Sequence, residues 1–99
     1  MLLEGRVALV TGGSRGLGRA DALALAEAGA DVVVADILDA EKTANDVRSM
    51  GRKSFAIKMD VTNIEEVKEG VNKIKKDFGS VDIPVNNAAT LDHLGQIFE

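Results

Sequence analysis

A glycine-rich segment near the start of the chain, Thr11 to Gly18, has the composition of a phosphate-binding turn. It follows four consecutive apolar residues, Val7 to Val10, which predict a strand buried on both faces, and it precedes a helix rich in Ala and Leu. The N-terminus of a helix attracts phosphate because it presents unpaired backbone N–H groups and the positive end of the peptide dipoles. We expect Gly12 to let the chain turn, Gly16 to admit a pyrophosphate close to the main chain, and Gly18 to let the helix pack near the strands.

A carboxylate ends the second predicted strand. Three valines between Asp31 and Asp36 predict another buried parallel strand, and Asp36 lies eighteen positions after Gly18. An acidic residue about 20 positions beyond such a turn binds the adenosine ribose in dinucleotide-binding folds. Asp36, followed by the apolar Ile37, can accept hydrogen bonds from both ribose hydroxyls and would repel a 2′-phosphate, so we expect NAD rather than NADP. Arg15 is the one residue of the turn that would favour NADP.

The remaining chain alternates helix and strand, which predicts an α/β fold with a Rossmann-like parallel sheet. We expect helices over 17–28, 40–50 and 64–78, and further strands over 54–60 and 81–86. Asp39 is the expected N-cap of the second helix, and Thr62 with Glu65 forms a capping-box pattern before the third. The third strand is less apolar than the first two and suits a sheet edge, and the expected strand order is 3-2-1-4. The first two helices then cover one face, the third covers the other, and the ligand crevice opens between strands one and four.

Four elements in this order resemble the short-chain dehydrogenase/reductase family: Thr11 to Gly18, Asp36, Asp60-Val61, and Asn86 to Ala89. The resemblance implies an oxidoreductase and covers the N-terminal portion of the family's domain, so residues 1–99 would form a dinucleotide-binding domain that is incomplete at its C-terminal end. It also implies that Asp60 contacts the adenine and that the last segment lies along the cofactor. The expected cofactor-binding residues are Thr11, Gly12, Ser14, Arg15, Gly16, Leu17, Gly18, Asp36, Ile37, Asp60, Val61, Asn87, Ala88 and Ala89. The alternatives are that Asp60 caps a strand end and that Asn86 and Asn87 only tie down backbone.

Two positions depart from the family's pattern. Ala89 stands where the family has glycine, so a positive φ there would be strained. Pro84 stands where the family has leucine, inside the fourth predicted strand, and proline lacks the N–H that a sheet ladder needs. We expect the Pro84 nitrogen to face away from strand one, so that Ile83 and Val85 direct their N–H groups toward it.

The family's catalytic groups have no counterpart in the chain. The resemblance implies a Tyr-x-x-x-Lys pair in which the tyrosine acts as general acid or base, and the chain contains no tyrosine. We therefore expect no catalytic residue, and His93, without partners, is interpreted as a surface or packing residue rather than a metal ligand. Three hypotheses remain: the cofactor-binding half of a short-chain NAD(P)-dependent oxidoreductase acting on an alcohol/ketone pair, a non-catalytic dinucleotide-binding module, or an inactive fragment.

Composition excludes several classes of protein. The net charge of −4 and the lack of a basic cluster argue against nucleic-acid and membrane-surface binding. No cysteine is available for a disulfide or a thiolate metal site, no segment resembles a signal peptide, and we expect a cytoplasmic protein. The fourth strand would have an unpaired edge, so we expect the chain to form a homo-oligomer, to aggregate, or to bind a complementary C-terminal segment.

Overall fold

Four parallel strands form the centre of the structure, a computed structural model in which residues 2–87 are described. The strand order is β3-β2-β1-β4, as the sequence predicts. The elements in chain order are β1 (Val7–Thr11), α1 (Gly16–Glu27), β2 (Asp31–Asp36), α2 (Glu41–Ser49), β3 (Ser54–Lys58), α3 (Ile64–Phe78) and β4 (Ile83–Asn86).

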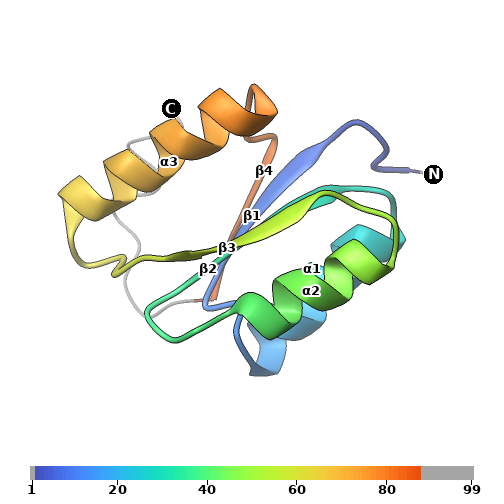
Figure 1. The fold of residues 1–99 in the computed structure, drawn as a ribbon, viewed down its shortest axis with the longest axis horizontal. Coiled ribbons are helices and arrows are strands. Elements are labelled where there is room, and N and C mark those ends of the chain that lie inside the picture. The colour runs from blue at the N-terminus through green and yellow to red at the C-terminus, as the bar shows by residue number, and fades with distance from the viewer. Residues whose placement is uncertain (1, 88–99) are drawn as a thin grey trace.

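The helices cover both faces of the sheet (Figure 1). On one face α1 and α2 pack against β1 and β2 through Ala22, Ala26, Ala44, Val47 and the facing side chains of the strands. On the other face α3 packs through Val67, Val71 and Ile74. Every residue of β1 is buried, because alternate side chains enter the two cores. The predicted layers are therefore confirmed, and α1 begins at the carboxyl end of β1.

The capping-box prediction for α3 is wrong by one residue. The N-cap is Asn63, whose Oδ1 accepts hydrogen bonds from the N–H groups of Glu65 and Glu66 at 3.1 and 3.3 Å. The Thr62 hydroxyl instead donates to the Asp60 carboxylate at 2.6 Å. Threonine is therefore used to close the preceding turn, and the neighbouring asparagine caps the helix.

The second helix also starts later than its predicted cap. The N-cap position of α2 is Ala40, although Asp39 still accepts a hydrogen bond at 2.9 Å from the N–H of Glu41.

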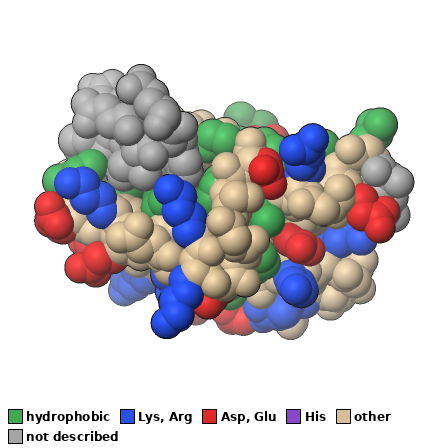
Figure 2. All heavy atoms as spheres, turned by 90° about the horizontal axis from the view of Figure 1, so that it is seen from above, with side chains coloured by type: hydrophobic (Ala, Val, Ile, Leu, Met, Phe, Trp, Pro, Cys, Tyr) green, Lys and Arg blue, Asp and Glu red, His purple; other side chains and the backbone are tan. Residues whose placement is uncertain are grey.

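The surface of α3 carries acidic residues in its first turn and basic residues in its last turn, which suits the helix dipole. Figure 2 shows Lys/Arg and Asp/Glu side chains interspersed on the face seen from above.

Pro84 lies inside β4, opposite Leu9 of β1. The N–H of Asn87, just after the strand, donates to the carbonyl of Thr11 at 3.3 Å. The N–H of Asp82, just before the strand, also donates to β1, and it lies five positions from Asn87, so the direction of the Pro84 nitrogen stays a prediction. Asp82, just before β4, ties the start of this short strand to β1, because its N–H donates to the Val7 carbonyl at 2.8 Å and its carboxylate accepts from the Val7 N–H at 2.9 Å.

None of the helices in residues 2–87 has the length and apolar character needed to span a membrane.

Candidate dinucleotide-binding site

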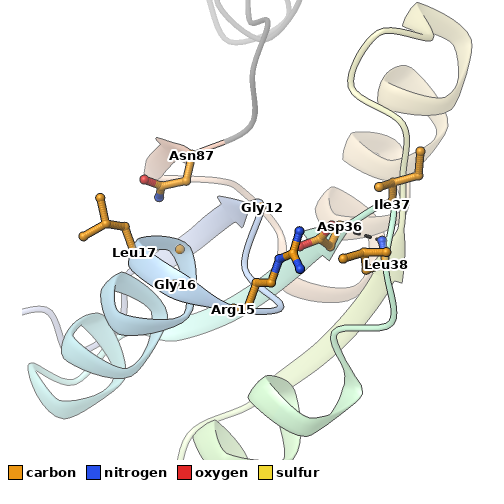
Figure 3. A pocket seen from close by; sticks show the side chains of 9 residues that line it. Gly12, Arg15, Gly16, Leu17, Asp36, Ile37, Leu38 and Asn87 are labelled. Carbon is orange, nitrogen blue, oxygen red and sulfur yellow. Dashed lines mark hydrogen bonds between the residues drawn. The ribbon is translucent and has the colours of Figure 1, made fainter.

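A pocket of about 450 Å³ opens at the carboxyl ends of the central strands (Figure 3). Its volume is within the range of roughly 300–1,000 Å³ typical of ligand sites. The β1–α1 turn, the start of α1, the end of β2 and the end of β4 supply its walls. The lining residues are Gly12, Arg15, Gly16, Leu17, Gly18, Asp36, Ile37, Leu38 and Asn87.

The β1–α1 turn depends on its glycines. Gly12 and Gly16 have φ of 66° and 61°, in the region that side chains rarely adopt. A Cβ on Gly18 would lie 1.9 Å from the carbonyl oxygen of Gly12, so the backbone of α1 packs against the backbone of the turn with no room for a side chain between them. Within residues 2–87, no side chain caps the N-terminus of α1, where Arg15 is the N-cap residue. The first N–H groups of α1 are thus left for an anionic ligand at the pocket.

Asp36 is tied to the glycine turn by its own carboxylate. One carboxylate oxygen accepts from the N–H of Ser14 at 2.9 Å and the other accepts from the N–H of Leu38 at 3.0 Å. Partial burial works to raise the pKa of Asp36, but hydrogen bonds from Ser14, Leu38 and Ile37 outweigh it, and the pKa lies below its usual value. Asp36 is therefore ionised at neutral pH. A carboxylate has about four acceptor sites, so Asp36 keeps capacity for the hydroxyls of a ligand beside the N–H groups of Ser14 and Leu38.

Apolar side chains also surround the pocket. Leu17, Ile37 and Leu38 are 76%, 57% and 45% exposed, and they are three of the five large hydrophobic residues that are exposed in the described part of the chain. Such surfaces can be covered by the flat rings of a ligand. In Figure 3, Leu17 and Asn87 lie on one side of the pocket, while Asp36, Ile37 and Leu38 lie on the other.

Some predicted site residues do not line this pocket. Thr11 is fully buried in β1, and its hydroxyl lies 3.4 Å from both the Val85 carbonyl and the Asn86 side chain, so it links β1 to β4. Ser14 is not among the lining residues, but its backbone N–H donates to the carboxylate of Asp36, which is. Ala88 and Ala89 lie outside the described residues.

Asp60 and Val61 are also outside the lining of this pocket. The Asp60 carboxylate accepts from the hydroxyl and the N–H of Thr62 at 2.6 and 2.9 Å, and these bonds lower its pKa. This geometry fits the alternative in which Asp60 caps the end of a strand, because its carboxylate binds the chain just after β3. Val61 packs against the core beneath α3.

Three residues of this region are missing from the predicted site residues. Leu38 lines the pocket beside Ile37, and its position could have been inferred from the apolar pair that follows Asp36. A Cβ on Gly13 would lie 2.3 Å from Cγ1 of Val34, so this glycine keeps the turn against β2. Asp21, in the second turn of α1, accepts a hydrogen bond from the Asn87 amide at 2.9 Å, a contact between residues 66 positions apart that no local pattern signals.

A parallel sheet covered on both faces, with a glycine turn and an acidic strand end at its carboxyl edge, is the architecture of the dinucleotide-binding folds of the α/β class. Comparison with known families assigns it further. Residues 6–98 match the short chain dehydrogenase family, and the chain belongs to that family.

Relatives in the family act on different substrates. Galactitol 2-dehydrogenase of Agrobacterium fabrum is 40% identical over 92 residues, which cover 93% of this chain and 36% of that protein. The crystal structure of hydroxysteroid dehydrogenase from Escherichia coli is 36% identical, with a TM-score of 0.84 over 89% of this chain and 38% of that one. Carveol dehydrogenase from Mycobacterium avium, solved in complex with NAD, is 30% identical, with a TM-score of 0.85 over 90% of this chain and 37% of that one. The chain thus spans little more than a third of the length of these relatives.

Proposed function

We propose that this chain is the NAD-binding portion of an oxidoreductase that transfers hydride between a nicotinamide and an alcohol/ketone pair. The observation that carries the proposal is the position of Asp36, an ionised carboxylate that lines the same pocket as the glycine turn and the N-terminus of α1. Membership of the short chain dehydrogenase family and similarity to an NAD-bound relative support it.

The residues of the pocket fit the parts of a dinucleotide. The N–H groups at the start of α1 suit the pyrophosphate, and the absence of a Cβ at Gly16 leaves the main chain open to it. Asp36 suits the adenosine ribose, and the exposed Leu17 and Ile37 suit flat rings. When bound, the nicotinamide accepts or donates the hydride.

The same geometry favours NAD over NADP. A ribose with two free hydroxyls can donate to Asp36, whereas a 2′-phosphate would bring like charges together. Arg15 also lines the pocket, and it is the residue that could stabilise a phosphate. Arg15 is exposed, so its charge is hydrated and screened, while the Asp36 carboxylate is fixed in place by Ser14 and Leu38. We therefore expect Asp36 to decide the preference.

The catalytic groups of the proposed reaction do not come from these residues. The 99 residues include no tyrosine, so the general acid or base expected from the family resemblance cannot be supplied by them. The residues at the pocket bind and orient a cofactor, and binding alone supplies no proton transfer. Hydride transfer by the proposed oxidoreductase therefore requires a general acid or base that these residues do not supply.

Isothermal titration calorimetry with NAD tests this proposal. The 99-residue chain should bind NAD at a single saturable site, and NADP should bind more weakly. A chain that is folded by circular dichroism and yet releases no binding heat with either nucleotide would overturn the proposed function. Equal or tighter binding of NADP would overturn the cofactor preference alone.

A further inference from the structure

Asp21 and Asn87 form a polar contact at the side of the pocket opposite Asp36. The Asn87 side-chain N–H donates to Oδ2 of Asp21 at 2.9 Å. The backbone of Asn87 is also held, because its N–H donates to the Thr11 carbonyl at 3.3 Å. Asn87 lines the candidate dinucleotide pocket, while Asp21 lines a neighbouring hollow of about 350 Å³ with Ala24, Leu25 and Val85. The pair therefore separates two hollows on either side of the end of β4.

The chemistry of the contact fixes the orientation of the Asn87 amide. An ionised carboxylate accepts hydrogen bonds and donates none, so only the NH₂ group of an amide can face it. With one N–H committed to Asp21, the carbonyl oxygen and the second N–H of Asn87 have defined positions. A freely rotating asparagine on an exposed strand end would instead lose side-chain entropy when it bound a ligand.

We propose that Asp21 is a positioning residue for the dinucleotide pocket, holding the Asn87 amide in the one orientation that meets the polar groups of the bound cofactor. This inference rests on the proposed function, because it requires that the pocket bind a dinucleotide. Asp21 itself faces the neighbouring hollow, and it acts through Asn87 rather than by touching the ligand. Its negative charge is not the active property, since charge alone would weaken the binding of an anionic dinucleotide.

Three variants separate positioning from charge. Asp21→Ala removes the acceptor and the charge, Asp21→Asn removes only the charge and keeps an acceptor oxygen, and Glu27→Ala removes an exposed carboxylate from the same helix at a distance from Asn87. NAD affinity is measured by calorimetry, and the side-chain NH₂ resonances of Asn87 are followed by ¹⁵N NMR without cofactor. Thermal unfolding of each variant is recorded alongside.

We expect Asp21→Ala to weaken NAD binding about fivefold, the effect of one ordinary hydrogen bond. Its Asn87 NH₂ resonances should shift toward those of a solvated amide. Asp21→Asn should stay within about twofold of the parent chain, and Glu27→Ala should match it in both measurements. In an Asn87→Ala background, the Asp21→Ala change should have no further effect on affinity, because Asp21 would have nothing left to position.

Other results would contradict the inference. If the parent chain binds NAD and Asp21→Ala binds it equally well, the inference is overturned and the proposed function stands. Equal losses in Asp21→Asn and Asp21→Ala would assign the effect to charge and would also overturn it. If the parent chain does not bind NAD, the proposed function and this inference fail together.

Discussion

Replacing Gly18 by alanine tests the close packing of α1 against the glycine turn. The new Cβ would lie 1.9 Å from the carbonyl oxygen and 2.6 Å from the carbonyl carbon of Gly12, and no side-chain rotation can relieve a contact with backbone. Overpacking costs about 1–3 kcal/mol, and we expect the upper end here. Alanine in place of glycine inside a helix returns about 1 kcal/mol. The net loss in the free energy of unfolding is then about 2 kcal/mol, which lowers Tm by about 10 °C in a domain of this size.

Gly70→Ala is the matched control for Gly18→Ala. Gly70 is also helical, in α3, and a Cβ there would lie 2.2 Å from Cε of Met59. That atom is the free end of a flexible side chain, so it can move, and the helical gain of about 1 kcal/mol offsets the cost. Urea and thermal unfolding followed by circular dichroism should therefore place Gly70→Ala within about 1 kcal/mol of the parent chain. A Gly18→Ala variant as stable as Gly70→Ala would refute the packing argument.

The other predictions concern the α3 cap, catalysis and the sheet edge. Asn63→Ala should lower the free energy of unfolding by about 1 kcal/mol, because two N–H groups lose their acceptor; a loss no larger than that of Thr62→Ala, measured by urea unfolding, would contradict this. The purified chain should show no steady NADH turnover with a panel of ketones, since it has no tyrosine, and sustained turnover would overturn the prediction. No described strand pairs with the outer edge of β4, so the chain should self-associate there or bind a complementary segment; a monomer that persists at high concentration in sedimentation, alone and with that segment, would count against it.

The sheet could be predicted because its signals are local. The valines of β2 and the apolar run of β1 indicate strands buried on both faces, and the weaker pattern of β3 indicates an edge, which is where it lies. Gly12 and Asp36 could be placed at one site because the carboxyl ends of parallel strands meet at one edge of the sheet.

The parts that could not be predicted depend on choices between neighbouring side chains. Thr62 and Asn63 are both good N-cap residues, and the structure places Thr62 in the turn with Asp60 and Asn63 at the start of α3. The bond between Asp21 and Asn87 joins the second turn of α1 to the end of β4, and no periodic pattern in the sequence connects them.

The ratio of the NADP and NAD dissociation constants, compared between the parent chain and Asp36→Ala, tests whether Asp36 decides which cofactor the pocket binds. Charge-assisted hydrogen bonds to the ribose contribute about 1.5–3 kcal/mol, so the parent chain should prefer NAD by about tenfold or more. In Asp36→Ala the ratio should fall to near one, chiefly because NAD binds more weakly, and unfolding curves check that the turn is intact without the Ser14 contact. A parent chain that binds NADP as tightly as NAD, or a folded Asp36→Ala variant that keeps the parent ratio, would contradict the account.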